Sequence, residues 1–126
     1  MVDPASGAPR AHAARWGRGG REPVRRGLDA QAEVAHVARR FGWKCLEFRP
    51  TWTPRGWRIA VCGSDAQGFV DLLMLRDSRM ICAEVKAGRS DPRPEQERWL
   101  NDLRSAGCEG GLWRIEAINE IVEQLR

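Results

Sequence analysis

The stretch "FVDLLMLRDSRMICAEVKAGRS", residues 69–90, decides the fold of this chain and raises its main chemical question. Two apolar runs flank a polar break at residues 76–79, which is the pattern of a β-hairpin. If the polar residues form the loop, counting outward along the two strands places Asp71 directly opposite Glu84. A two-residue loop keeps this register, whereas a three-residue loop breaks it. The hairpin is therefore expected to carry two carboxylates on one face of its most hydrophobic strands.

The two carboxylates and a neighbouring lysine predict a metal site. Like charges directly opposite each other across a strand pair are destabilising, and partial burial strengthens the repulsion. Lys86 lies on the same strand face as Glu84 and offsets part of it. A divalent cation bound by Asp71 and Glu84 would offset it better, because Mg²⁺ prefers carboxylate, phosphate and water oxygens. Such a site could hydrolyse a phosphodiester, with Lys86 orienting water or stabilising the developing charge. The other interpretation is a salt-bridged strand face without a metal, as in a plain interaction module.

The rest of the apolar pattern predicts one mixed α/β domain with the element order α-β-β-β-β-α-β-α. Helix ends are indicated by capping residues and glycines, and strands by short β-branched and aromatic runs. The expected elements, in chain order, are a helix from Asp29 to about Phe41, strands at 44–49 and 57–62, the hairpin, a helix begun by Ser90 or Asp91 and closed by Gly107, a strand at 111–115 and a helix at 116–126.

Gln96 belongs to the apolar stripe of the helix that follows the hairpin. It precedes Trp99 and Leu100 by three and four positions, so it should face the sheet. From there its amide could hydrogen-bond a metal-bound water, the backbone near Lys86 or a phosphate. The alternative is a glutamine at the end of a buried stripe with its amide in water.

The positive charge lies entirely in the N-terminal segment. The chain has a net charge of +4, and residues 1–27, with six Arg, one Asp and one Glu, account for all of it. This segment is rich in Pro, Gly, Ala and Arg without a period, so it is expected to be a disordered tail that precedes a domain at 28–126. An Arg-rich arm can bind nucleic-acid phosphates, but a solvated extension explains the composition equally well.

Several classes of protein are disfavoured by the sequence. The four cysteines are scattered, without a Cys-x-x-Cys pair or a histidine cluster, which argues against a zinc site or a disulfide framework. The apolar runs are too short to cross a bilayer, and no signal peptide is recognised. We therefore expect a cytoplasmic protein that binds neither a membrane nor a small organic cofactor.

The order of the hairpin and helix residues resembles a known nuclease motif. An Asp, then Glu-x-Lys about a dozen residues on, then a Gln in the next helix, is the ordered signature of the PD-(D/E)XK nucleases. More narrowly, residues 68–107 resemble the VRR-NUC family of virus-type replication and repair nucleases. This resemblance implies a restriction-endonuclease-like mixed-sheet core flanked by helices, and Mg²⁺- or Mn²⁺-dependent hydrolysis of DNA.

By position, the resemblance assigns a role to four residues. Asp71 and Glu84 would be metal ligands, Lys86 the catalytic lysine and Gln96 the fourth motif residue. Small members of the family come from phages and bacteria. Some resemble junction-cleaving enzymes that act as dimers, so a homodimer is one implied state.

The chain departs from the family pattern at three places. Val70 stands where the family has proline before the aspartate, which alters the backbone path and no ligand. The usual acid of the first helix has no clear counterpart, with Asp29 the nearest candidate and Glu33 the second. The segment before Gly68 is longer than usual and could form an extra hairpin or a substrate-contacting loop.

The site residues predict metal-dependent phosphodiester hydrolysis, and the resemblance implies a DNA nuclease, encoded by a phage or prophage, that acts on branched or single-strand-containing DNA. Arg89, Arg93 and Arg98 surround the predicted site and are candidate phosphate contacts, although each could equally be a surface residue. The alternative function is a catalytically inactive nuclease fold that only binds nucleic acid, since the helix acid is uncertain.

Overall fold

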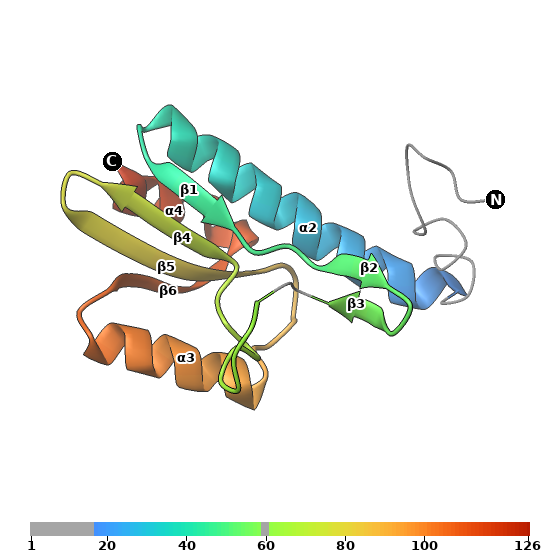
Figure 1. Ribbon diagram of the computed structural model, residues 1–126. Helices are drawn as coiled ribbons and strands as arrows, with labels where there is room; N and C mark the ends of the chain where they lie inside the picture. The colour runs from blue at the N-terminus through green and yellow to red at the C-terminus, as the bar shows by residue number, and fades with distance from the viewer. Residues whose placement is uncertain (1–16, 59–60) are drawn as a thin grey trace.

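The computed structural model describes residues 17–58 and 61–126 of the chain (Figure 1). It confirms a mixed α/β architecture, with one additional strand compared with the expected order. The elements are α2 (Gly17–Arg40), β1 (Lys44–Glu47), β2 (Thr51–Thr53), β3 (Gly56–Arg58), β4 (Leu72–Arg76), β5 (Arg79–Lys86), α3 (Pro94–Ser105), β6 (Glu109–Arg114), the 3-10 helix η1 (Ile115–Ala117) and α4 (Ile118–Leu125).

The main sheet has four strands in the order β1-β4-β5-β6. The pairs β1–β4 and β4–β5 are antiparallel, and β5–β6 is parallel, with α3 forming the crossover. Helices α2 and α4 pack on one face of the sheet, whereas α3 packs on the other face (Figure 1). The sheet is therefore covered on both sides at β5, the strand that carries Glu84 and Lys86.

The β4–β5 hairpin has the register predicted from the sequence. Its pairs run from Leu72↔Ala83 at the open end to Arg76↔Arg79 at the turn. The turn is the two-residue loop Asp77–Ser78, whose φ angles of 49° and 68° belong to the left-handed region of tight hairpins. The last pair of the ladder is Leu72↔Ala83, so Asp71 lies just outside the ladder, and its backbone N–H donates to the Ala83 carbonyl at 3.1 Å.

The core lies between the sheet and the α2–α4 face. Alternate residues of β5 point toward it, and Ile81, Ala83 and Val85 are almost fully buried there. A second, smaller cluster under α3 contains Val70, Cys82 and Leu100. The odd-numbered side of β5 therefore serves the core, and the even-numbered side faces α3 and the candidate site.

Three expected boundaries were wrong. Helix α2 begins at Gly17, well before the expected cap at Asp29, so the part of the predicted tail from 17 to 27 is helical; residues 1–16 lie outside the described part. The cap of α3 is Arg93, because Pro94 takes the first helical position. The predicted strand 57–62 ends at Arg58 in β3, and residues 61–62 are not strand.

The additional hairpin is formed by β2 and β3, which make a two-stranded sheet of their own. Trp52 pairs with Trp57 across it, and the two rings meet edge to face with centroids 5.5 Å apart. The hairpin extends from the end of β1 along α2, away from the four-stranded sheet (Figure 1). The extra hairpin expected for this segment is therefore present.

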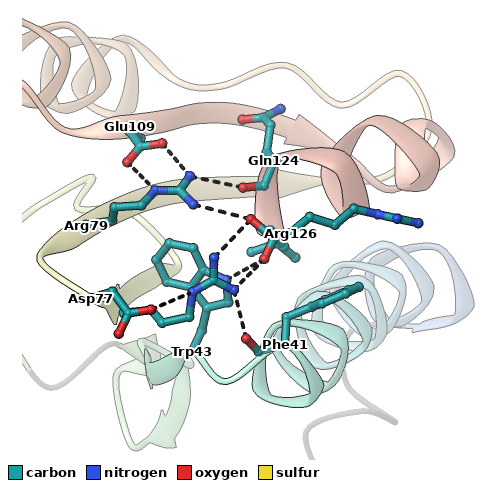
Figure 2. Close-up of polar contacts among 9 residues, drawn as sticks. Phe41, Trp43, Asp77, Arg79, Glu109, Gln124 and Arg126 are labelled. Atoms are coloured by element: carbon teal, nitrogen blue, oxygen red, sulfur yellow. Dashed lines mark hydrogen bonds and ion pairs between the residues drawn. The ribbon is translucent and has the colours of Figure 1, made fainter.

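Two arginines at the β4–β5 turn hold the C-terminal helix against the sheet (Figure 2). Arg76 donates to the carbonyls of Phe41, Leu125 and Arg126 at 2.8–2.9 Å. Arg79 makes a bidentate ion pair with Glu109, and both guanidinium groups lie over the Trp43 ring, at 4.6 and 5.0 Å from its centroid. The ends of α2 and α4 are therefore tied to the hairpin turn.

Within the described residues, none of the helices is sufficiently long and apolar to cross a membrane. All four cysteines are free thiols, and Cys82 and Cys108 lie with their sulfurs 3.9 Å apart.

Candidate active site

A cleft of about 1070 Å³ opens at the end of the sheet where β5 leaves the core. Its walls come from α2, the β2–β3 hairpin, the segment before β4, and the connection from β5 to α3. The four residues singled out by the motif, Asp71, Glu84, Lys86 and Gln96, all line it. The fold therefore brings together side chains that lie as far as 25 positions apart in the sequence.

Glu84 is the most buried charged side chain of the cleft, with 1% of the residue exposed. Its Oε1 accepts a hydrogen bond from Gln96 Nε2 at 2.7 Å and pairs with Lys86 Nζ at 3.3 Å. Its Oε2 is also buried and accepts no hydrogen bond from a donor among the described residues, although the Asp71 carboxyl can hydrogen-bond to Glu84 when the two acids share a proton. A buried carboxylate oxygen without a partner is costly, so this atom is suited to a cation.

Asp71 lies beside Glu84 at the start of β4. Its Oδ2 accepts the Val85 backbone N–H at 2.8 Å, which fixes the carboxyl against β5. Burial raises the pKa of Asp71, while the Val85 N–H and the charge of Lys86 oppose the rise. The sequence argument that placed these two acids side by side is confirmed, although they meet at the end of the ladder and not inside it.

The electrostatics of the pair favour one bound proton or a cation. Burial, and then the neighbouring Asp71 carboxyl, raise the pKa of Glu84 to about 7, and Lys86 offsets only part of this shift. The folded protein therefore resists carrying both negative charges at neutral pH without a further positive partner. A divalent cation would supply that partner, because it favours the ionised form of both groups.

Gln96 connects the site to the start of α3. Its Oε1 accepts the backbone N–H of Arg93 at 2.8 Å, so its Nε2 is left to donate to Glu84. Gly68 holds the preceding segment against this turn: a Cβ at Gly68 would lie 2.7 Å from the Glu95 backbone and 2.9 Å from the Gln96 nitrogen. The prediction that Gln96 faces the sheet is confirmed, and its amide orientation follows from the cap.

The contribution of α2 to the site differs from the one expected. Asp29 and Glu33 are exposed and do not line the cleft, so the structure does not bring either acid to the metal position. Gln31 lies between them and lines the cleft; it is 3% exposed, and its Nε2 donates to the carbonyls of Asp71 and Phe48 at 3.1 and 3.5 Å. Positions two apart on a helix point in nearly opposite directions. Because Gln31 faces inward, Asp29 and Glu33 face outward.

Gln31 was missed from the sequence, although a signal was present. It follows Ala30 and precedes Val34 and Ala35 by three and four positions, so it belongs to the buried stripe. A polar residue inside such a stripe needs buried hydrogen-bond partners.

Arginines surround the mouth of the cleft. Arg89 and Arg93, both predicted as phosphate contacts, line it, and so does Arg58 of β3. Arg98 is exposed on α3 and does not line the cleft. Among the described residues that line the cleft, Asp71 and Glu84 are the only acids, so the described part of the lining has a negative floor inside a positive rim.

The donor set fits a hard divalent cation held by few protein ligands. No group of three or more His, Cys, Asp or Glu side chains that could hold a metal is present in the described ranges 17–58 and 61–126. Two carboxylates are nevertheless sufficient for Mg²⁺, which keeps several waters and takes further oxygens from a phosphate. The partnerless Glu84 Oε2 beside Asp71 is the structural feature that fits such an ion.

Comparison of the chain with protein-family models, with curated proteins and with solved structures found no match in any of the three.

Proposed function

We propose that this protein is a metal-dependent nuclease that hydrolyses phosphodiester bonds of DNA, with branched or single-strand-containing DNA as substrate. One observation carries the proposal: the buried Glu84 has one oxygen tied to Lys86 and Gln96 and a second oxygen without a described partner, next to Asp71. The motif resemblance points to the same chemistry and to a restriction-endonuclease-like core.

Each residue has a distinct role in the proposal. Asp71 and Glu84 would hold Mg²⁺ or Mn²⁺, which, when bound, neutralises phosphate charge and makes a bound water more acidic. Lys86, whose Nζ lies 3.3 Å from Glu84 Oε1, is placed to orient water and to stabilise charge that develops on the phosphate oxygens. Gln96 orients Glu84, and the rim arginines bind the flanking phosphates.

The proposal is tested by cleavage of a labelled panel consisting of duplex, single strand, flap and four-way junction. Each substrate is incubated with Mg²⁺, Mn²⁺ or EDTA. The wild type should cut in either metal and not in EDTA, and Lys86→Ala should lose at least about 100-fold in rate. Lys44→Ala is the matched control, because Lys44 is the only other lysine and is exposed outside the cleft. Cleavage that persists in Lys86→Ala would contradict the assigned role.

A catalytically inactive nucleic-acid-binding module is the second candidate. The observation that favours it is Gln31, a neutral side chain at the place where α2 meets the two acids. This candidate predicts DNA binding without cleavage in any divalent metal. Binding without cutting by the wild type, together with unchanged binding by Lys86→Ala, would select it over the nuclease.

A further inference from the structure

The β2–β3 hairpin places an aromatic ring in the wall of the cleft that holds the two acids. Trp57 and Arg58 of β3 line this cleft, whereas Trp52, on the partner strand, does not. We propose that Trp57 is the platform of a nucleobase site, which stacks one unpaired base of the strand whose phosphate lies over Asp71 and Glu84. This inference deepens the proposed nuclease function and rests on it for the position of the phosphate.

The chemical character of the wall fits a base and not a further phosphate. Apolar and aromatic side chains, Phe48, Val61 and Phe69 besides Trp57, line the cleft next to its charged floor. A nucleotide combines a flat base with a negatively charged phosphate, so it matches both parts of this lining. Stacking of a base on an aromatic side chain is favourable and tolerant of sequence.

The wall also explains why the base should be unpaired. In a duplex, each base has both faces covered by its neighbours, and the phosphates are presented on the outside. A side chain beside the phosphate-binding floor can reach a base face only where the strand is unstacked. The hairpin therefore favours single strands, flaps and junction arms over continuous duplex.

The charges of the cleft are arranged for a strand that crosses it. Arg58 lies on the hairpin wall, next to Trp57, and its Nη1 donates to the Trp57 carbonyl at 2.8 Å. Arg89 and Arg93 line the cleft from the connection between β5 and α3. Phosphates on both sides of the scissile bond would thus meet a guanidinium, which positions the strand without reading its sequence.

The hairpin holds Trp57 in place before any ligand binds. The Trp52 ring contacts it at an interplanar angle of 82°. The turn is fixed by Thr53, whose Oγ1 donates to the Gly56 carbonyl at 2.7 Å and accepts the Arg55 N–H at 3.2 Å. A fixed platform reduces the ordering cost of binding.

The test measures binding separately from cleavage. Full-length Lys86→Ala is used as the background so that the DNA stays intact, and fluorescence anisotropy reports affinity for a labelled thymidine oligonucleotide. Further arms are a blunt duplex, a uridine oligonucleotide, and a thymidine strand with abasic sites, which keeps the phosphates and lacks the bases. In this background we compare Trp57→Phe with Trp57→Leu. We also compare Arg58→Gln with Arg55→Gln, which is the matched control because Arg55 is exposed in the same hairpin and lies outside the cleft.

Trp57→Leu should weaken single-strand binding by about 5- to 100-fold, whereas Trp57→Phe should retain most of it. Binding of the blunt duplex should change by less than about twofold, since its bases are covered. Abasic sites in the strand should lower its affinity for the Lys86→Ala parent protein to the affinity that Trp57→Leu shows for the intact strand. The affinity of Trp57→Leu itself should not change when the strand has abasic sites. Arg58→Gln should weaken binding of every strand in the panel, whereas Arg55→Gln should weaken binding of none. Equal affinity for the thymidine and uridine strands would show that the site binds the base and does not select the sugar.

Equal losses on single strand and duplex, or no loss with abasic sites in the parent protein, would overturn the inference. The abasic arm needs no substitution in the hairpin, so it decides even if Trp57→Leu unfolds. Failure of the nuclease proposal is seen separately, as absence of metal-dependent cleavage by the wild type. If the wild type binds single strands through Trp57 but never cleaves them, the base-site inference is supported and the nuclease proposal is contradicted.

Discussion

Glu84 has a buried carboxylate between one positive and one negative neighbour. Lys86 pairs with its Oε1, whereas burial, and then the Asp71 carboxyl, raise the pKa of Glu84 to about 7. The lysine alone therefore does not balance the two acids. This imbalance separates the metal-site interpretation from the plain salt-bridge interpretation, because the two differ in the sign of a stability change.

In the metal-free protein, Glu84→Gln should increase thermal stability at about pH 8. The pKa of Glu84 rises from 4.5 to about 7 on folding, so the folded state binds this proton more tightly. Stability from that proton is complete below about pH 4.5 and is lost as pH rises through about 7, by roughly 3 kcal/mol. The gain of the variant should thus be absent near pH 4. Thermal melts in EDTA at both pH values measure it.

The surface variant Glu97→Gln serves as control, because Glu97 is exposed on α3 and does not line the cleft. Added Mg²⁺ or Mn²⁺ should stabilise the wild type at pH 8 and should have little effect on Glu84→Gln. A variant less stable than the wild type in EDTA at pH 8 would favour the salt-bridge interpretation.

Gln96→Glu should destabilise the metal-free protein in a pH-dependent manner. The substitution replaces the Nε2 donor, 2.7 Å from Glu84 Oε1, with an acceptor and adds a third carboxylate. A loss of about 1–3 kcal/mol is expected at pH 8, and less near pH 4, where Glu84 is protonated and the repulsion is weaker. Urea unfolding measures it. Gln67→Glu, the same change at an exposed position of the same cleft, should be nearly neutral; an equal loss there would point to general charge repulsion.

At the scale of elements, the parallel contact of β5 with β6 depends on a missing side chain. Gly110 has φ +96°, and a Cβ there would lie 2.5 Å from the Cys82 carbonyl oxygen. Gly107 has nearly the same φ, +93°, with nothing within 4 Å. The two glycines share a backbone conformation, but only Gly110 has neighbouring atoms where a Cβ would lie.

Gly110→Ala should therefore destabilise the protein more than Gly107→Ala. Both variants carry the cost of a left-handed conformation, about 1 kcal/mol, but only Gly110→Ala forces β6 away from β5. We expect the difference to exceed about 1 kcal/mol in chemical unfolding. Comparable losses of stability in the two variants would mean that β5 and β6 can move apart at Gly110 without an energetic cost.

The sequence predicted the β4–β5 hairpin well, because side-chain alternation and two apolar runs leave few registers. It failed at the start of α2, where Pro and Gly suggested a disordered tail. A helix already held by packing from Ala30 to Ala38 extends at little cost per residue, so composition did not decide its start.

For the site, the hairpin residues and Gln96 were predictable because local periodicity fixes their faces. Gln31 was missed although its place in the buried stripe of α2 was a signal, because the stripe does not tell which partners a buried amide meets. Arg58 was not identified, since its place depends on how the β2–β3 hairpin meets the sheet, and no local pattern carries that information.

At the scale of the molecule, Arg76 joins three parts of the fold. Its guanidinium donates to Phe41 at the end of α2 and to Leu125 and Arg126 at the end of the chain, and it lies over Trp43. A planar group with several fixed donors is needed for these contacts.

Arg76→Lys should destabilise the protein by about 1–3 kcal/mol in urea unfolding, because one ammonium cannot reach all three carbonyls. Arg98→Lys is the matched control, since Arg98 is exposed on α3. Equal stability of Arg76→Lys and the wild type would show that charge alone suffices at this position.

The alternation of β5 has a consequence for how the gene tolerates change. Ile81, Ala83 and Val85 face the core, and Glu84 and Lys86 lie on the other side of the same strand. Loss of one codon between 79 and 83 would turn Glu84 and Lys86 toward the core-facing side of β5, so a charged pair would enter the core and the cleft would lose both side chains together. A codon lost between 61 and 67, where no strand is formed, leaves this register intact. Length variation among descendants of this gene should therefore collect in the connecting segment and spare the hairpin.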